Sequence, residues 1–553
     1  MPLKIILNTI SLEIIMKKLS IFTSLFALLM LVSCSSNQGG NEPSPSPSPT
    51  PTPTPTPTPV GPSHIDQSFN FKILSSNDIH GQVEEENISS YSGRAGIGKF
   101  FTYAKHVKES NPYTLLFDQG DTFQGSIYSN ENRGELITKA MAYAHYDARA
   151  IGNHDFDWGV EPLRNLKDVG YGDYTVPTLG ANIYNYDFNN KSFLPTHRDD
   201  FCDKTAICSF SNGFKVGVIG TIGSNQIKDI LTSNVMDLNF KNHINVIKQE
   251  ATALREQGCH FIVSLHHGNI AELMGNNLSQ YIDLGLCGHS HSEESDSEGD
   301  THYFQFACYT EILGVLNFSF DASTQKVSFT SSSSKRASDI ESAGYGVDSV
   351  ISGLINDAKE DIKTRMNPDQ VVASNVNGDF KSTTTAANLV AKAMYDTAIS
   401  EGYDVDLAYC NQLRHTLYSP SWTFSDIYQA APFDNRIYIV DVPYEEVSSE
   451  IKAWNNICKQ NGRTINLSPG QTLKVACLDF LLFHASNYRY FDYFPSIGPY
   501  FNDRDNKPQL SKNYRDTLKD WLISKGYSTG KQLNSSDYYS TVSDFNKNEI
   551  VLS

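Results

Sequence analysis

Phe71-Lys72-Ile73-Leu74, followed closely by Asn77-Asp78-Ile79-His80-Gly81, joins a short apolar run to a polar motif. An apolar run of this length predicts a buried β-strand, and the polar residues then lie where that strand ends. Asp78 and His80 are two positions apart, so their side chains point to the same side and can bind one metal ion.

The same arrangement recurs along the chain, because at least four of five polar motifs follow an apolar run. The further runs are 113–117, 261–265 and 284–287. The further motifs are Gly120-Asp121, Gly152-Asn153-His154-Asp155, His266-His267-Gly268 and Gly288-His289-Ser290-His291. Side chains at the carboxyl ends of neighbouring strands converge in an open α/β sheet, which is where such sheets keep their sites. The sequence therefore predicts an α/β fold in which the motifs share one site.

The side chains of these motifs suit divalent metal ions. Asp121 follows a predicted strand and a glycine, and its carboxylate can bridge two cations. Asn153 offers a neutral oxygen, and His266 and His289 offer imidazoles. His291, two positions beyond His289, can complete the ligand set of the ion that the first motif binds. Carboxylate, amide and imidazole ligands suit several first-row ions, so zinc, manganese and cobalt all remain open.

Composition narrows the class of protein. The chain has 553 residues and a formal net charge of -18, which argues against a nucleic-acid partner and makes a phosphate substrate depend on bound cations. The folded part is long enough to predict two domains. Cys202 and Cys208 are close enough in a loop-like stretch to form a disulfide, and whether they pair is open.

The N-terminal segment has the features of an export signal. Lys17 and Lys18 precede the apolar stretch 21–32, which has the length of a signal peptide and is too short to span a bilayer. Cys34 follows small residues, as in the lipobox of bacterial lipoproteins, so we expect a lipidated Cys34 and a location in the bacterial cell envelope, facing the periplasm or the outside. Met16 leaves a second possible start.

A tether follows the lipidation motif. Residues 43–59 alternate Pro with Ser or Thr, which favours polyproline II and offers no apolar side chains to bury. Further along, apolar side chains recur at helical spacing over 347–365, which predicts an amphipathic helix.

In type and order, the five motifs resemble those of the calcineurin-like metallophosphoesterases. More narrowly they resemble the branch of bacterial 5′-nucleotidases, UDP-sugar hydrolases and 2′,3′-cyclic-nucleotide phosphodiesterases, which carries Gly-Asn-His-[Glu/Asp]-Phe-Asp. Here that run is Gly152-Asn153-His154-Asp155-Phe156-Asp157. The resemblance implies an α/β (α+β) two-domain fold, with an N-terminal four-layer αββα sandwich and a C-terminal α+β domain of the 5′-nucleotidase type.

The resemblance also implies roles for individual residues. One metal would be held by Asp78, His80, Asp121 and His291, and the other by Asp121, Asn153, His266 and His289. His154, with Asp157 behind it, would stabilise the phosphate during transfer. The family spacing His-x-Gly selects His266 as the ligand and makes His267 a residue that lines the cavity. The alternative is that His267 is the ligand. His106, His145 and His243 lie in helix-like stretches and are expected at the surface.

The C-terminal region resembles the substrate domain of the family less closely. Phe433 and Phe483 fall where two aromatic rings would hold the nucleobase, and Arg414 falls at a phosphate-binding arginine. The glycines of the corresponding loops are replaced, in Asn411-Gln412-Leu413 and in 487–491. Glycines in such loops allow the backbone to approach a ligand closely, so the sequence leaves the substrate open between a nucleotide and another phosphoester.

The resulting prediction is an exported, lipid-anchored, two-metal phosphohydrolase of the 5′-nucleotidase type. The alternatives are the same chemistry on a cyclic nucleotide, UDP-sugar or sugar phosphate, and a binding lipoprotein without turnover. The predicted segments are a signal peptide (1–33), a lipidated tether (34–66), a metallophosphoesterase domain (67–340), an interdomain helix (341–366) and a substrate domain (367–553).

Overall fold

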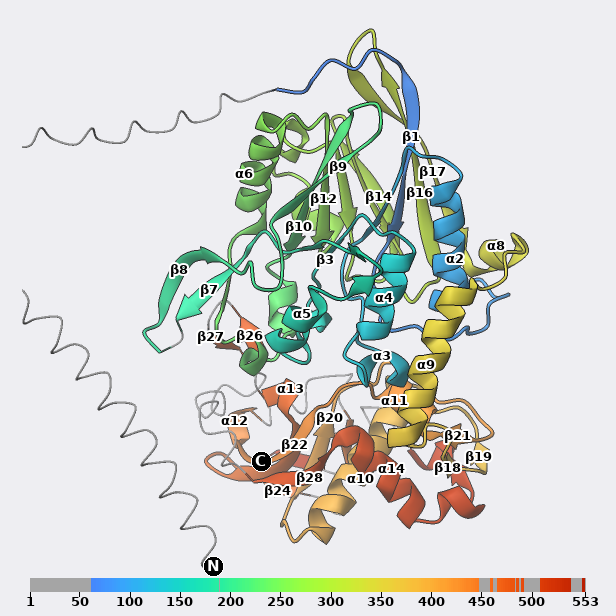
Figure 1. The fold of residues 1–553 in the computed structure, drawn as a ribbon. Helices are drawn as coiled ribbons and strands as arrows, with labels where there is room; N and C mark the ends of the chain where they lie inside the picture. The colour runs from blue at the N-terminus through green and yellow to red at the C-terminus, as the bar shows by residue number, and fades with distance from the viewer. Residues whose placement is uncertain are drawn as a thin grey trace, which may run out of the picture. The chain divides into compact units, whose positions relative to one another are not determined.

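The computed structural model describes residues 61–187, 189–446, 458–460, 465–482, 484–486, 489–491, 508–538 and 550–552 (Figure 1). The predicted signal peptide, Cys34 and the Pro-rich tether at 43–59 lie outside these residues. Among the helices that are described, none combines the length and the apolar character needed to cross a bilayer.

Two six-stranded sheets form the N-terminal part. The first runs in the order β17 (Lys326–Arg336), β16 (Ile312–Asp321), β1 (Phe69–Ser76), β2 (Thr114–Asp118), β3 (Ala148–Ala150) and β6 (Thr178–Leu179). The second runs in the order β14 (Glu293–Glu298), β15 (Thr301–Phe306), β13 (Leu284–Cys287), β12 (Phe261–His267), β10 (Lys215–Ile222) and β9 (Thr205–Ser209). Strands β1, β2, β3 and β6 are parallel, as are β10, β12, β13 and β15. The four strands predicted from apolar runs are confirmed.

The sheets pack face to face because their strands alternate between two apolar cores. Phe71 and Ile73 of β1 join Val263 and Leu265 of β12 in one fully buried core between the sheets. Leu74 of β1 points the other way, into the core beneath α2 (Gly96–Glu109) and α4 (Glu135–Tyr143). Ile262 of β12 likewise faces α6 (His243–Glu256). Helix, sheet, sheet and helix therefore form four layers, as predicted.

Shorter elements connect these strands. They are β4 (Gly170–Tyr171), β5 (Tyr174–Thr175), β7 (Ile183–Asp187), β8 (Ser192–His197), β11 (Leu238–Phe240), α3 (Ile127–Asn130), α5 (Val160–Leu166), α7 (Ile270–Leu273), α8 (Ala337–Ser342), η1 (His154–Phe156), η2 (Gln226–Asp229), η3 (Thr232–Asn234) and η4 (Leu278–Gln280). Cys202 and Cys208 are both free thiols, so the disulfide considered for them is not formed.

Helix α9 (Ser349–Arg365) follows the two sheets and confirms the predicted helix. Its first turn is capped by Asp348, whose Oδ1 accepts a 2.8 Å hydrogen bond from the Val350 N–H. Tyr143 of α4 donates to Asp348 Oδ2 at 3.0 Å. Ile351 and Ile362 are fully buried, which gives the helix one apolar face.

The C-terminal part is built on a mixed five-stranded sheet. Its order is β23 (Cys458–Gln460), β20 (Leu407–Cys410), β25 (Thr472–Leu478), β22 (Arg436–Pro443) and β28 (Gln509–Asn513). Helices α10 (Thr385–Ser400), α11 (Phe424–Ala430) and α14 (Tyr514–Ser524) accompany it. The smaller elements are β18 (Val371–Ala373), β19 (Val376–Asn377), β21 (Trp422–Thr423), β24 (Ile465–Leu467), β26 (His484–Ser486), β27 (Arg489–Phe491), β29 (Leu533–Asn534), β30 (Ile550–Leu552), α12 (Tyr444–Glu446), α13 (Asp479–Leu482), η7 (Tyr527–Thr529) and η8 (Ser535–Tyr538). The mixed sheet with separate helices agrees with the predicted α+β class.

Candidate metal centre

Five predicted ligands have an uncommon backbone conformation. Their φ angles lie in the left-handed region: Asp78 (50°), His80 (47°), Asp121 (53°), His289 (78°) and His291 (59°). Residues with side chains rarely adopt such angles, and those that do concentrate at functional sites. The loops after β1 and β2 hold each other in place, since the N–H groups of Asp78 and His80 donate to Gly120 O at 3.0 Å and Asp121 O at 2.9 Å.

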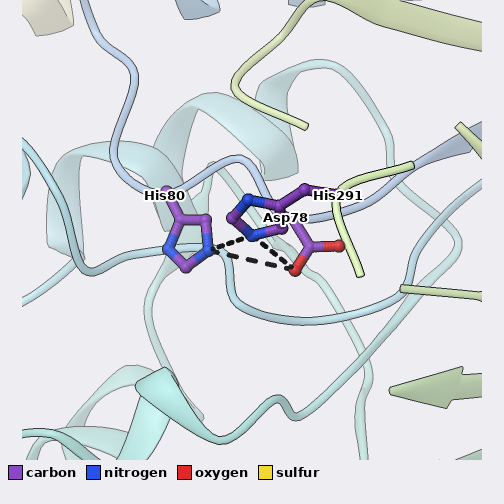
Figure 2. A group of neighbouring side chains, drawn as sticks. All are labelled: Asp78, His80 and His291. Carbon is purple, nitrogen blue, oxygen red and sulfur yellow. Dashed lines mark hydrogen bonds and ion pairs between the residues drawn. The ribbon is translucent and has the colours of Figure 1, made fainter. Parts of the chain in front are cut away.

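Asp78, His80 and His291 form a first cluster (Figure 2). His80 Nε2 lies 3.0 Å from His291 Nε2. Asp78 Oδ1 lies 3.5 Å from His291 Nε2 and 3.9 Å from His80 Nε2. Three potential ligand atoms from residues that the sequence singled out thus lie within 4.8 Å of one another.

Asp121, Asn153, His267 and His289 form a second cluster. His267 Nε2 lies 3.2 Å from Asp121 Oδ2 and 3.0 Å from Asn153 Oδ1. His289 Nδ1 lies 3.1 Å from the same Asn153 oxygen. Asp121 Oδ2 also lies 3.7 Å from His80 Nε2, so one carboxylate oxygen stands between the two clusters.

The structure places one predicted ligand away from the second cluster. The sequence prediction chose His266, but His266 lies on the opposite face of β12, where its Nδ1 is 3.0 Å from Thr221 Oγ1. His267 occupies the place in the cluster instead. The physical reason is strand alternation: Val263, Leu265 and His267 point toward the first sheet, and Ile262 and His266 point toward the helices.

The orientation of two histidine rings suits metal binding. His80 Nδ1 and His267 Nδ1 lie 3.1 Å from Gln124 O and 2.8 Å from Gln119 O, so each ring directs its Nε2 atom at the cluster. Asp78 Oδ1 is buried without a hydrogen-bond partner among the described residues. A buried carboxylate oxygen without a partner is costly, and a cation would satisfy it.

Burial and charge oppose each other in these groups. Burial lowers the pKa of His80 well below its usual range and that of His289 to about 4. Burial acts in the same direction on His267, but the Asp121 carboxylate outweighs it and raises the pKa of His267 to about 10. Burial would raise the pKa of Asp121, whereas the surrounding imidazoles, His267 foremost, bring it well below its usual range. Asp121 therefore keeps a negative charge that calls for a positive partner.

His154 stands beside the clusters rather than in them. Its backbone N–H donates to Asp121 Oδ1 at 2.8 Å, and its ring Nδ1 lies 3.0 Å from Asp157 Oδ2. Arg414, from the C-terminal part, places Nη2 2.5 Å from His154 Nε2. Because a guanidinium can only donate, Nε2 accepts and Nδ1 carries the proton toward Asp157. Burial and the nearby Arg414 guanidinium lower the pKa of His154, but Asp157 outweighs them and raises that pKa above its usual value.

A cavity of about 470 Å³ opens beside His154. Both parts of the chain line it, with His154, Asp157 and His289 on one side and Asn411, Gln412, Leu413, Arg414 and Phe433 on the other. The Phe433 ring centroid lies 5.4 Å from that of His154. Phe483, the second predicted aromatic, lies outside the described residues. Trp158, Tyr438 and Phe480 are further aromatic residues of the lining.

Two residues of the site were not predicted. Tyr309 donates its N–H to Asp78 O at 2.8 Å, and its ring centroid lies 5.2 Å from that of His80. Asp229 Oδ2 lies 3.8 Å from His289 Nε2. Both lie outside the five motifs, and only the chain's path through space brings them to the site. For His267, strand alternation separates it from His266, but both faces of β12 are buried, so only the packing shows which of the two faces the clusters.

Comparisons with known proteins point to one family. Residues 71–293 match the family model described as calcineurin-like phosphoesterase. A 5′-nucleotidase from Diplobatis ommata is 27% identical over 279 residues, which are 46% of this chain and 46% of that protein. A 5′-nucleotidase from Homo sapiens is 26% identical over 242 residues, 41% of this chain and 38% of that protein. The chain thus spans about half of the length of the curated relatives it matches.

Solved structures extend the likeness over most of the chain. The 5′-nucleotidase precursor of Thermus thermophilus superposes with a TM-score of 0.66 at 16% identity, covering 87% of this chain and 99% of that one. A putative 5′-nucleotidase from Staphylococcus aureus gives 0.64 at 15% identity, covering 88% and 100%. At these identities the likeness concerns the fold, and it confirms the two-part architecture. Residues 71–293 of the chain thus form a calcineurin-like phosphoesterase domain.

Proposed function

We propose that the chain is a metal-dependent phosphoester hydrolase of the 5′-nucleotidase type. The observation that carries this proposal is the pair of ligand clusters that share Asp121 and stand next to His154 and Arg414 at the cavity. The ligand sets would be Asp78, His80, Asp121 and His291 for one ion, and Asp121, Asn153, His267 and His289 for the other. Two divalent ions in such a site activate water as a nucleophile and neutralise phosphate oxygens.

His154 and Arg414 would hold the phosphate. Their nitrogen atoms lie 2.5 Å apart, so a phosphate oxygen that displaces this contact would reach both a guanidinium and an imidazole. Asp157 would orient the His154 ring and help it keep a second proton, which offsets charge that develops on the leaving oxygen. Asp157 is a positioning residue in this scheme, because it acts through His154.

A nucleotide is the substrate class that the cavity supports best. Its volume of about 470 Å³ lies within the range of small-molecule sites, and Phe433 offers an aromatic face beside the phosphate position. Phe483 stays a predicted second base-binding residue. Relatives described as 5′-nucleotidases favour the same class. A cyclic nucleotide, UDP-sugar or sugar phosphate is the second candidate, because Asn411, Gln412 and Leu413 replace the loop glycines.

The cellular location belongs to the same proposal. We infer that the protein is exported and held at the bacterial cell envelope by lipid on Cys34, with 43–59 as a spacer. The metal ions would be zinc, manganese or cobalt, and no nucleic-acid polymer is expected as a partner.

The deciding experiment combines chelation with Asp121→Ala. Phosphate release from AMP, ATP, UDP-glucose, 2′,3′-cyclic AMP and p-nitrophenyl phosphate is measured before chelation, after it, and after adding back Zn²⁺, Mn²⁺ or Co²⁺. We expect chelation to abolish turnover. Asp121→Ala should lower turnover more than about 100-fold, because even residues behind metal ligands contribute about 10–100-fold and this one serves both ions. Asp321→Ala, an exposed carboxylate at the end of β16, is the matched control. Full turnover in the chelated protein would contradict the proposal.

A further inference from the structure

A third group of potential metal ligands lies on the other face of β12 from the paired clusters. His266 of β12, His243 at the start of α6 and Glu272 of α7 bring one ligand atom each within 4.8 Å of one another. The ring centroids of the two histidines are 4.8 Å apart. His243 was expected at the surface, but only 6% of it is exposed, and His266 is fully buried. We call these three residues the α6–α7 cluster.

In each side chain of the α6–α7 cluster, one polar atom contacts a neighbouring residue, and this contact sets the orientation of the side chain. Thr221 Oγ1 lies 3.0 Å from His266 Nδ1, and Ser224 Oγ lies 3.4 Å from His243 Nδ1. Glu272 Oε1 accepts from Gln226 Nε2 at 2.9 Å and from the Asn269 N–H at 3.3 Å. Metal-binding histidines and carboxylates in proteins are held in this way by a second set of residues.

The opposite polar atom of each side chain has no partner. His266 Nε2, His243 Nε2 and Glu272 Oε2 are buried and make no hydrogen bond among the described residues. The Glu272 backbone carbonyl faces the His243 ring as well, without the geometry of a hydrogen bond to Nε2. Burying three such atoms without partners is costly for each of them. A single cation would satisfy all three at once.

Two glycines keep the space around these atoms open. A Cβ on Gly268 would lie 2.4 Å from His266 Nε2. A Cβ on Gly223 would lie 2.7 Å from Glu272 Oε2 and 2.1 Å from Gln226 Oε1, a further buried oxygen without a partner. The unpartnered atoms therefore border a space that any larger residue at either position would fill.

We propose that His243, His266 and Glu272 bind a third divalent cation, separate from the catalytic pair. Two imidazole nitrogens and a carboxylate oxygen form a donor set typical of zinc, and Gln226 Oε1 is the nearest candidate for a fourth ligand. Zinc bonds of about 2.0–2.2 Å hold ligand atoms about 3.4 Å apart in a tetrahedron, so modest side-chain rotations would close the site. The ion would tie the start of α6 and helix α7 to the end of β12, the strand that also carries His267.

The test compares the zinc content of variants with that of the wild-type chain, so the loss of one ion is read without any measurement of activity. The full chain is purified, loaded with Zn²⁺, freed of loosely bound metal, and analysed by elemental mass spectrometry. We expect about three zinc ions per wild-type chain and one fewer in both His243→Ala and Glu272→Gln. His302→Ala, a histidine of β15 that packs on Phe329, is the matched control and should keep the wild-type number.

A second measurement covers the case in which a variant fails to fold. Crystals of the zinc-loaded wild-type chain should show an anomalous-scattering peak between His243, His266 and Glu272 at the zinc edge. An unchanged zinc content in both folded variants, or an absence of that peak beside clear peaks at the paired clusters, would overturn the proposal and leave a buried water as the partner of these atoms.

Discussion

Asp121 shows how much of the chemistry rests on single atoms. Its Oδ2 faces His80 in one cluster and His267 in the other, while its Oδ1 accepts the His154 N–H. Gly152 makes this contact possible, since a Cβ there would lie 2.2 Å from Asp121 Oδ1. Position 152 therefore has to be glycine, because its backbone lies too close to the Asp121 carboxylate to carry a side chain. The residues of the site fall into two groups: the metal ligands, and the residues that would bind the phosphate.

His154 belongs to the second kind, and substitution should separate turnover from metal binding. We expect His154→Ala to lower kcat by about 100-fold or more, the usual cost of removing a group that stabilises developing charge, with the metal content unchanged. Steady-state kinetics and elemental analysis on the same preparation measure both. Asp157→Asn should give a smaller loss and a shifted pH profile, because it acts through the ring. Loss of one metal ion in His154→Ala would instead make His154 a ligand.

His267 and His266 provide a direct comparison of neighbouring residues. We expect His267→Ala to lower phosphatase turnover at least about tenfold more than His266→Ala does, because a ligand contributes more than residues behind it. Turnover and zinc content are measured for both variants. A larger loss in His266→Ala would restore the ligand assignment made from the sequence spacing.

Among the larger elements, the loop after β20 determines how a substrate would be recognised. Its backbone is already engaged, since Leu413 N–H donates to Ser382 O at 3.1 Å and Arg414 N–H donates to Ala430 O at 2.9 Å. Those N–H groups cannot also approach a ribose, as a glycine-rich loop would permit. The Phe433 segment is anchored as well, because Pro432 O accepts from Asn130 Nδ2 at 2.9 Å. Arg414 and Phe433 are therefore presented rigidly, with little help from the loop backbone.

This leads to a prediction about substrate preference. We expect kcat/KM for p-nitrophenyl phosphate to come within about 100-fold of that for AMP, because stacking of a base on one aromatic ring contributes about 1–3 kcal/mol, or about one to two orders of magnitude. Phe433→Ala should change the ratio of the two values by about 100-fold at most, and Phe433→Tyr, which keeps an aromatic face, should change it less. A strong AMP preference that collapses in Phe433→Ala would show an ordinary nucleotide pocket.

In the molecule as a whole, the cavity exists only where the two parts of the chain meet. Arg133 Nη1 lies 3.2 Å from Asp434 Oδ2, and Tyr428 donates to Glu131 Oε1 at 2.8 Å, so α3 and the C-terminal part are joined beside the site. Substrate would contact clusters on one part and Arg414 on the other. The geometry of binding therefore depends on the contact between the parts as well as on the ligands.

The proposed anchor is also a property of the full chain. Cys34→Ser should move the protein from the membrane fraction to the soluble envelope fraction, since lipid on this cysteine would be its attachment. Cell fractionation with antibody detection measures this, and Cys308→Ser, a buried cysteine, is the control that should remain at the membrane. Unchanged membrane association in Cys34→Ser would contradict the lipobox assignment.

Local sequence was enough to predict the strands and the types of donor. Apolar runs that precede Asp78, Asp121, His266 and Gly288 identified β1, β2, β12 and β13, because a buried strand needs such a run and a metal site needs such donors. The motif around His154 pointed to phosphoester chemistry through its resemblance to the calcineurin-like metallophosphoesterases. These are local properties, and each can be recognised within about ten residues.

The packing of the folded chain determined which face of a strand meets which partner, and which residues distant in sequence come together. Whether His266 or His267 joins the paired clusters depends on which face of β12 packs against the first sheet. His243 is buried because α6 covers the other face of that strand. Arg414 reaches His154 across 260 residues of sequence. Local sequence cannot encode such choices, because they are set by the packing of layers whose partners lie far away in the chain.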